Sequence, residues 1–307
     1  LPNPIPWLNA ADLSQMMHDN LPDERKALIF GIGAVLMWST VATGFKLGLA
    51  VLAPAQLLLL GACVSAAVFV PVAIRSGWPK RGLNFREGLV FALMNPVLYY
   101  LVLFEAYDRL PAQIAQPLNY TWAIMLALLA VPVLGQRLSL RMGLGIFIGY
   151  LGVVVLLSQG RFDALPDVDW LGVALALGST LIWAGYWLFN ARSATEPAAL
   201  MATSFLLAIP VLLVVCLLGP GLPELSSDAL LYGAWVGLVE MGVTFLLWQQ
   251  ALRRTQHAGR IGQLIFLSPF LSLLLIGAVL GETVHLTSWI GLGIIVLGLL
   301  VTGRPNT

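Results

Sequence analysis

Apolar runs long enough to cross a membrane dominate this sequence. A membrane-spanning helix needs about 20 mostly apolar residues, because the hydrocarbon core is about 30 Å thick and a helix rises about 1.5 Å per residue. Ten such runs, separated by short links that contain Gly and Pro, are predicted at residues 27–47, 52–74, 86–107, 112–134, 141–158, 170–190, 198–218, 229–252, 258–280 and 288–302. Because backbone polar groups in lipid must be satisfied internally, the sequence predicts an all-α membrane protein with ten transmembrane helices.

The composition leaves no room for a soluble catalytic domain. Hydrophobic residues make up 59% of the 307 residues and charged residues 10%, whereas a soluble domain carries about 25% charged residues. No GxxxxGK[ST] phosphate loop and no HExxH zinc motif occurs, and Cys63 and Cys216 lie within apolar runs. We therefore expect no enzyme, no cofactor and no metal site, and the net charge of +1 does not indicate a nucleic-acid partner.

Basic residues gather on one side of the predicted membrane. All but three of the 16 Lys and Arg residues lie in the tails and links of that side, and the exceptions are Lys46, Arg109 and Arg161. Cytoplasmic loops of membrane proteins carry the excess of Lys and Arg. We therefore expect both termini in the cytoplasm, which an even number of spans permits.

The chain contains an internal repeat. The stretches GQRLSLRMGLGI (135–146) and GETVHLTSWIGLGI (281–294) share a Gly-polar start and an identical GLGI, and Trp38 pairs with Trp183 at an offset of 145 residues. Five spans is an odd number, so the second copy enters the membrane from the opposite side, as in inverted-repeat transporters with a binding site near the midplane. The predicted divisions are a cytoplasmic tail at 1–26, a first five-helix repeat at 27–160, and a second repeat with a short C-terminal tail at 161–307.

Glu240 is an acid near the middle of the predicted span 229–252. A charge at the bilayer centre costs roughly 2.5–3.5 kcal/mol on insertion scales, so such a residue normally faces a bundle interior or a wet cavity. The repeat offset relates Glu240 to Asn95, which lies mid-span before Pro96. Three roles stay open for Glu240: it takes up a proton that drives transport, it holds the ammonium group of a substrate, or it is neutral and hydrogen-bonded in a structural role.

Aromatic and amide residues at mid-span positions predict a wet, aromatic-walled substrate cavity. Its expected lining is Trp38, Ser39, Thr43, Asn95, Tyr99, Gln116, Asn119, Tyr120, Trp183, Tyr186, Trp187, Glu240, Thr244 and Gln263. Other roles compete for some of these residues. Tyr186 and Trp187 also suit an interfacial anchor, Ser39 and Thr43 can bond their own helix backbone, and the amides of Asn119 and Gln263 can join helices. Two GxxxG patterns, Gly145–Gly149 and Gly233–Gly237, are typical of close helix packing.

The sequence resembles the EamA-type drug/metabolite transporter superfamily over about residues 27–302, and looks most like bacterial exporters of aromatic and other neutral amino acids. The resemblance is carried by Trp38-Ser39-Thr40, by Pro269 followed by LSLLLIGAVLGE up to Glu282, and by the glycine-rich last span around Gly291. It implies a ten-helix inverted-repeat carrier with a central cavity, in the bacterial inner membrane. The first repeat departs from the pattern, with Gly135-Gln136 in place of Gly281-Glu282. We expect the glycine-acid pair Gly281-Glu282 to cap or orient a helix end.

Transport of a small amphipathic solute by alternating access is therefore the leading hypothesis, with aromatic and other neutral amino acids favoured by the resemblance. Export of drugs or organic cations is the first alternative, because one acid and several aromatic rings also suit a cation. An integral-membrane enzyme that modifies lipid is the second, although the sequence offers no nucleophile and base pair at membrane depth. The expected partners are a small-molecule substrate and the lipid bilayer, and the chain is compatible with a monomer.

Overall fold

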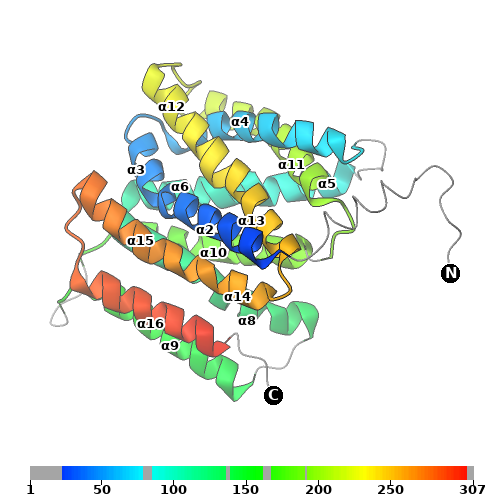
Figure 1. Cartoon of the computed structure of the whole chain (residues 1–307). Helices are drawn as coiled ribbons and strands as arrows, with labels where there is room; N and C mark the ends of the chain where they lie inside the picture. The colour runs from blue at the N-terminus through cyan, green and yellow to red at the C-terminus, as the bar shows by residue number, and fades with distance from the viewer. Residues whose placement is uncertain (1–22, 79–84, 136–138, 162–166, 191, 303–307) are drawn as a thin grey trace, which may run out of the picture.

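The computed structural model describes residues 23–78, 85–135, 139–161, 167–190 and 192–302. Within these ranges every regular element is a helix, as the apolar runs predict. The helices lie side by side in one bundle (Figure 1). The elements are α2 (Glu24–Ser39), α3 (Val41–Leu49), α4 (Pro54–Arg75), α5 (Phe85–Ala92), η1 (Leu93–Leu98), α6 (Tyr99–Arg109), α7 (Ala112–Tyr120), α8 (Trp122–Leu134), α9 (Leu140–Ser158), α10 (Trp170–Asn190), α11 (Pro197–Leu218), α12 (Ser227–Trp235), η2 (Val236–Val243), α13 (Thr244–Arg254), α14 (Ala258–Gln263), η3 (Leu264–Leu267), α15 (Ser268–Leu275), η4 (Ile276–Leu280) and α16 (Leu286–Thr302).

Nine helical segments of the described chain are long and apolar enough to cross a membrane. They are Glu24–Leu49, Pro54–Arg75, Phe85–Arg109, Ala112–Val133, Leu140–Ser158, Trp170–Asn190, Pro197–Leu218, Ser227–Arg254 and Arg260–Leu280. The last apolar run forms the shorter helix α16, which packs along α9. Helix α2 begins and α16 ends at the same end of the bundle (Figure 1).

Several spans are interrupted near their middle. The first span breaks at Thr40 and the fourth at Thr121, and in each case the threonine hydroxyl donates to a carbonyl three residues earlier, to Met37 O at 2.6 Å and to Leu118 O at 2.8 Å. The third and eighth spans instead contain π-helical turns, η1 and η2. Irregular backbone at membrane depth is tolerated where protein or a cavity, rather than lipid, surrounds it, so these breaks point to the bundle interior.

The interior helices form two groups that each combine both repeats. Group A consists of α2–α3, η2–α13 and α14–α15, and group B of α6, α7–α8 and α10. In group A the first span packs on the eighth and ninth, and in group B the sixth span packs on the third and fourth. In a pseudo-twofold repeat the first helix of each repeat packs on the third and fourth helices of the other repeat, and this is the arrangement found here. The pairs α9–α16 and α4–α11 flank the two groups on opposite sides (Figure 1).

Glycines bring α9 and α16 into backbone contact. A Cβ on Gly298 would lie 2.5 Å from the Gly149 nitrogen and 2.6 Å from the Gly145 oxygen, and one on Gly291 would lie 2.7 Å from the Gly152 oxygen. The expectation that Gly145 and Gly149 form a packing face is confirmed. Small residues are favoured at such interfaces because lipid supplies no hydrophobic force between helices and close packing must hold them together.

The second GxxxG pattern has the same role against α4. A Cβ on Gly233 would lie 2.5 Å from Leu60 Cβ, and one on Gly237 would lie 2.6 Å from the Gly61 oxygen. The prediction of a close-packing face at Gly233–Gly237 is therefore also confirmed.

The α9–α16 interface yields a stability prediction. Gly298→Leu must push two backbones apart, and we expect it to lower the free energy of unfolding by about 1–3 kcal/mol or more. Gly293→Leu on the same helix is the matched control, because a Cβ there has no neighbour within 4 Å. Thermal unfolding in detergent, followed by circular dichroism, measures both variants. Equal melting temperatures for the two would contradict the packing role of Gly298.

Candidate functional site

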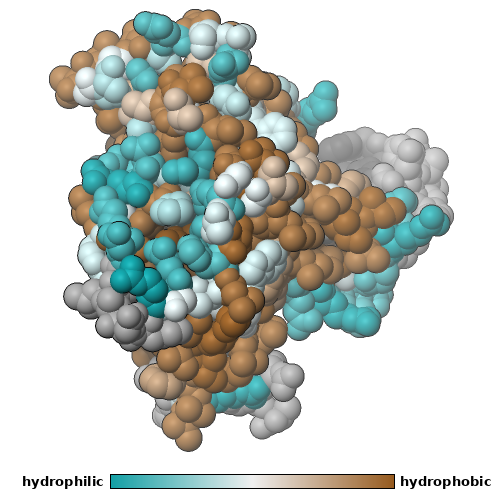
Figure 2. Space-filling view, turned by 90° about the vertical axis from the view of Figure 1, so that its left-hand side faces the viewer, coloured by the Kyte–Doolittle hydropathy of each residue, from teal (hydrophilic) through white to brown (hydrophobic). Residues whose placement is uncertain are grey.

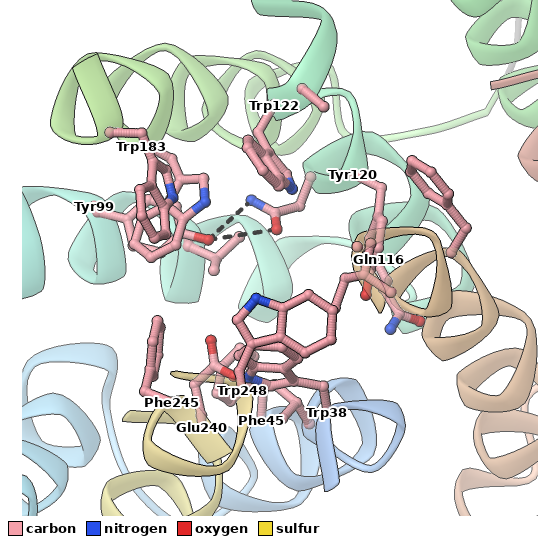
Figure 3. Close-up of a pocket in the computed structure, with 18 of the residues that line it drawn as sticks. Trp38, Phe45, Tyr99, Gln116, Tyr120, Trp122, Trp183, Glu240, Phe245 and Trp248 are labelled. Atoms are coloured by element: carbon pink, nitrogen blue, oxygen red, sulfur yellow. Dashed lines mark hydrogen bonds between the residues drawn. The ribbon is translucent and has the colours of Figure 1, made fainter. Parts of the chain in front are cut away.

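A cavity of about 420 Å³ lies between group A and group B (Figure 3). Ligand pockets in proteins typically enclose about 300–1,000 Å³, so a single small molecule fits. Group A contributes Trp38, Val41, Phe45, Glu240, Phe245, Trp248, Leu252, Gly262, Ile265 and Phe266 to the wall. Group B contributes Tyr99, Leu103, Tyr107, Gln116, Asn119, Tyr120, Trp122, Ala123, Trp183 and Trp187.

Aromatic rings form most of the wall. On the group B side Tyr99 stacks on Trp183, with ring centroids 4.4 Å apart and an interplanar angle of 25°. On the group A side Trp38 contacts Trp248 at 5.5 Å and Phe245 at 5.6 Å. Such walls suit a flat apolar body, because aromatic pairs prefer offset-stacked or edge-to-face arrangements.

The polar groups of the cavity are few and include one carboxylate. Asn119 is 3.4 Å from the Tyr99 hydroxyl through its Oδ1 and donates from Nδ2 to Ser179 Oγ at 3.2 Å. Glu240 accepts a hydrogen bond from the Tyr100 hydroxyl at 2.9 Å. No Lys, Arg or His belongs to the described lining. The arrangement therefore suits cations and neutral N–H donors better than anions.

Two further cavity groups are buried without a hydrogen-bond partner in the described part of the chain. They are the Gln116 Oε1, an acceptor, and the Trp187 Nε1, a donor. Buried polar atoms normally have partners, and both residues line the cavity. Both atoms lie behind the cavity surface rather than on it.

Glu240 and Asn95 occupy matching places in the two repeats, inside η2 and η1. Glu240 lines the cavity, but Asn95 does not. The expectation that Asn95 shares a cavity face with Tyr99 assumes a regular helix. Instead Asn95 has extended backbone angles (φ −147°, ψ 115°) before a cis peptide bond to Pro96, because the proline disfavours the helical region for the residue before it. The Asn95 side chain is buried.

Eight of the fourteen residues expected from the sequence line the cavity: Trp38, Tyr99, Gln116, Asn119, Tyr120, Trp183, Trp187 and Glu240. The other six lie outside its lining: Ser39, Thr43, Asn95, Tyr186, Thr244 and Gln263.

Helix phase explains why several of these six residues turn away from the cavity. The cavity stripe of the first span follows Trp38, Val41 and Phe45, so Ser39 and Thr43 lie on the adjoining face. The Ser39 hydroxyl bonds Leu36 O at 2.7 Å, as the backbone alternative predicts. In the eighth span the Thr244 hydroxyl likewise donates to its own helix, at the carbonyl of Val239.

Two more expected residues have other surroundings. The Tyr186 hydroxyl is 3.6 Å from Met201 Sδ, although its ring still stacks on Trp183 at 5.4 Å. Gln263 is exposed near the end of α14. Neither side chain belongs to the cavity wall.

The eighth span shows why the sequence did not indicate two of the cavity residues, Phe245 and Trp248. A regular helix brings residue i+4 onto the face of residue i, so a regular helix would place Thr244 on the same face as Glu240. The π-helical turn η2 bonds i to i+5 and inserts an extra residue per turn, so Phe245 and then Trp248 follow Glu240 on the wall. Phe45 could have been predicted from the sequence, because Trp38, Val41 and Phe45 follow one another at helical spacing on one face of the first span.

One end of the cavity is closed by contacts between group A and group B. Phe45 packs on Phe104 at 4.7 Å and on Tyr107 at 5.3 Å. Next to it Lys46 Nζ donates to Tyr107 O at 2.8 Å and to Leu110 O at 3.2 Å. Phe45 and Tyr107 are almost completely buried, so this end of the cavity has no open path.

Glu282 adds a second link at the closed end. Its carboxylate accepts from the backbone N–H groups of Ala112 at 2.9 Å and Gln113 at 3.2 Å, the first residues of α7. The Gln113 side chain donates to Thr283 O at 2.8 Å and accepts from the Ser288 hydroxyl at 2.9 Å. The expectation that Gly281-Glu282 caps a helix end is confirmed, whereas Gln136 lies outside the described residues. A carboxylate at a helix N-terminus is stabilised by the free N–H groups and the helix dipole.

Ion pairs lie on the surface of the same end. Arg109 pairs with Glu105 at 2.8 Å and with Asp169 at 3.4 Å, as expected for charges near a membrane face. The backbone N–H of Gly172 and then the Arg109 guanidinium lower the pKa of Asp169. Figure 2 looks onto this end and shows hydrophilic side chains gathered over part of it, with apolar surface around them.

The opposite end of the cavity is more open. Its wall there is formed by Leu252, which is 38% exposed, and by the partly exposed Gly262 and Trp248. The cavity therefore communicates with the end of the bundle at which α13 ends and α14 begins.

Comparison with known proteins gives a consistent result. The model of the EamA-like transporter family matches residues 25–158 and again residues 170–304. A protein from Archaeoglobus fulgidus named as a transporter is 24% identical over 277 residues, covering 89% of this chain and 96% of that protein. The transporter YvbV of Bacillus subtilis is 27% identical over 172 residues, 53% of each chain.

A solved crystal structure shares the fold. It matches with a TM-score of 0.62 at 22% identity, over 90% of this chain and 96% of its own. The duplicated family match covers both halves of the sequence, and two relatives carry the name of transporter. This chain is a multi-pass membrane protein of the EamA-like transporter family.

Proposed function

We propose that the protein is a secondary carrier that exports small amphipathic solutes, with aromatic and other neutral amino acids as preferred substrates. The observation that carries the proposal is the aromatic cavity of about 420 Å³ with one carboxylate, enclosed between two groups of helices and closed at one end. No phosphate-binding loop for ATP occurs in the sequence, so existing gradients supply the energy. Membership of a transporter family favours transport over lipid modification.

The cavity can hold an amino acid without a basic residue. The stacked Tyr99 and Trp183 rings form an aromatic wall against which a flat side chain can pack, and Glu240 offers an acceptor for the ammonium group. The Trp187 Nε1 donor and the Gln116 Oε1 acceptor are buried without partners beside the cavity, and a side-chain rotation would present them to the carboxylate and to an N–H group. Substrate contacts are accordingly assigned to the eight cavity residues that the sequence indicated.

The proposed topology has ten transmembrane helices. The nine long spans are joined by α16, which is short but packs along α9. Residues 27–160 and 161–307 then form two inverted five-helix repeats after the tail at 1–26. The excess of Lys and Arg favours a cytoplasmic position for both termini. The resemblance to bacterial exporters favours the bacterial inner membrane, and the chain is compatible with a monomer.

Transport proceeds by alternating access around the cavity. In this topology the α13–α14 link is cytoplasmic, so the described conformation is open toward the cytoplasm and closed toward the outside. That is the state in which an exporter loads its substrate. Group A then moves against group B to close the inner end and open the outer one, as in other inverted-repeat carriers.

Organic cations are the second candidate substrates, and one observation favours them. The described cavity wall holds a carboxylate and no basic residue, so a cation finds a charge partner while the carboxylate of an amino acid does not. Aromatic rings within about 6 Å of a cation contribute about 0.5–2 kcal/mol through cation–π attraction.

Flux through the purified protein tests the proposal. Proteoliposomes are loaded with labelled phenylalanine or with a fluorescent organic cation, and efflux is followed with and without a pH gradient. We expect saturable efflux of phenylalanine that empty liposomes lack. Saturable efflux of the cation alone would support the second candidate, and no saturable efflux of either would contradict transport of both classes.

The role of Glu240 yields a second prediction. We expect Glu240→Gln to raise the KM for amine-bearing substrates roughly tenfold at every pH, because a hydrogen bond to a charged group contributes about 1.5–3 kcal/mol. Efflux assays at several pH values measure it. The control is Glu224→Gln, an exposed acid outside the cavity.

The other two roles of Glu240 give different results in the same assay. Loss of the pH dependence of efflux, with little change in KM, would identify Glu240 as a proton carrier. Efflux kinetics equal to those of the Glu224→Gln control would leave only a structural role.

The closed end yields a third prediction. Glu282→Ala removes two hydrogen bonds that join the link between η4 and α16 to α7 of group B, so we expect the outer end to open more often. In a background of Cys63→Ala and Cys216→Ala, Leu103→Cys places a thiol deep in the cavity. We expect a membrane-impermeant maleimide added from outside to label it at a rate about tenfold higher, given about 1.5–3 kcal/mol for a hydrogen bond to a charged group.

Glu224→Ala is the matched control for this experiment, because Glu224 is an exposed acid in the link between α11 and α12. Its labelling rate should equal that of the parent. An unchanged rate in Glu282→Ala would show that Glu282 does not hold the outer end closed.

A further inference from the structure

Tyr100 lies directly behind the cavity, at the second residue of α6. Only 1% of its surface is exposed, and it is not part of the cavity lining. Its ring is enclosed by Phe45 at 6.5 Å, Tyr99 at 4.7 Å and Phe104 at 5.5 Å. This aromatic packing leaves the ring one orientation, in which its hydroxyl reaches Glu240 Oε1 at 2.9 Å.

The hydrogen bond from Tyr100 determines how Glu240 faces the cavity. A carboxylate has two oxygens and about four acceptor positions, and Tyr100 occupies one of them on Oε1. In the described part of the chain no other hydrogen bond or ion pair to Glu240 is formed, and the residue lines the cavity. Oε2 is left as an acceptor, and Figure 3 shows Glu240 among the side chains that line the cavity.

The repeat shows that this pair occurs once. At the offset of 145 residues Tyr100 corresponds to Phe245, and Glu240 corresponds to Asn95. The hydroxyl is therefore present only in the first repeat and the acid only in the second. The two meet across the boundary between group B and group A, so the related pair, Asn95 and Phe245, cannot form the same hydrogen bond.

The adjacent Tyr99 supplies the other half of a recognition site. It stacks on Trp183 at 4.4 Å and contacts Tyr100 at 4.7 Å. The aromatic wall at Tyr99 and the Glu240 carboxylate bonded by Tyr100 thus lie next to each other, because Tyr99 and Tyr100 are the first two residues of α6. A molecule with an aromatic ring and a nearby ammonium group can use both at once.

We propose that Tyr100 is a positioning residue that orients Glu240 to accept an N–H group, so that the carrier selects flat amines with an ammonium head over cations that lack N–H. The inference rests on the proposed function of the cavity and names its substrate class. Tyr100 acts through Glu240 and does not itself touch the substrate. Amino acids and simple amines share the ammonium head, and the test separates the two.

Binding to the purified, full-length protein tests the proposal directly. Quenching of tryptophan fluorescence reports binding, because Trp38 and Trp183 line the cavity. The probes are phenethylamine, phenylalanine and tetraphenylphosphonium, a cation without N–H. We expect Tyr100→Phe to weaken phenethylamine binding about tenfold, the loss typical of a hydrogen bond to a charged group, and to change tetraphenylphosphonium binding less than about twofold.

Two comparisons separate positioning from a merely structural effect. Tyr150→Phe makes the same chemical change on α9, where the hydroxyl has no hydrogen-bond partner among the described residues, and should behave like the parent. In a Glu240→Gln background the effect of Tyr100→Phe should vanish, since the coupling energy of a double-mutant cycle belongs to the pair. If Tyr100→Phe weakens phenylalanine binding as much as phenethylamine binding, the positioning role of Tyr100 extends to amino acids.

Several results would overturn the proposal. They are equal weakening of all three probes, no weakening of phenethylamine, or the same effect of Tyr100→Phe with and without Glu240→Gln. Failure of the wild type to bind phenethylamine would also overturn it. Binding that shows the Tyr100 dependence without any efflux from proteoliposomes would support this inference while contradicting the proposed transport function, so the two fail separately.

Discussion

The hydrocarbon core cannot hydrogen-bond a peptide group, and this constraint organises the molecule. Each span must keep its backbone bonds internal, which makes regular helices the rule at the lipid surface. Four irregularities lie beside the cavity: the break at Thr40, the break at Thr121, and the π-helical turns η1 and η2. Each of the four spans concerned places a residue at or close to the irregularity on the cavity wall, namely Trp38, Tyr99, Trp122 and Glu240. Irregular backbone and cavity are thus parts of one arrangement, because only an interior surface can satisfy the released backbone groups.

The two repeats pack by different physical means in different places. At α9–α16 glycines remove the side chains and let backbones touch. Against α4, Gly233 of α12 meets the Leu60 side chain and Gly237 of η2 meets the Gly61 backbone. Between group A and group B the contacts are instead bulky aromatic rings and a few polar links, and space is left over. Tight interfaces of small residues resist relative movement, whereas an aromatic cavity with hydrogen bonds at one end permits it. The proposed alternating access uses this difference.

The site combines an apolar wall with one oriented acid. The repeat makes the two halves of the wall alike in position, but Glu240 and Tyr100 have Asn95 and Phe245 as their counterparts, so the cavity is chemically asymmetric. The two repeats also differ at the position of Glu282. This residue caps α7, whereas the matching residue of the first repeat is Gln136. Symmetry accounts for the architecture, and the departures from it supply polarity to the site.

The amino-acid sequence was enough to predict the helical class, the approximate spans, the repeat, the packing role of the glycine patterns and the helix-capping role of Glu282. These follow from local physics: apolar length, helical period and the absence of a side chain at glycine. It also indicated eight residues of the cavity wall, because mid-span amide and acidic residues are costly in lipid and Trp and Tyr normally lie at the membrane interface instead. The packing of the helices was needed to show that Phe245 rather than Thr244 follows Glu240, that Asn95 turns away, and that Tyr100 bonds the acid. The reason is that a π-helical turn or an extended residue before proline rotates every following side chain, and neighbouring helices determine where such irregularities are stable.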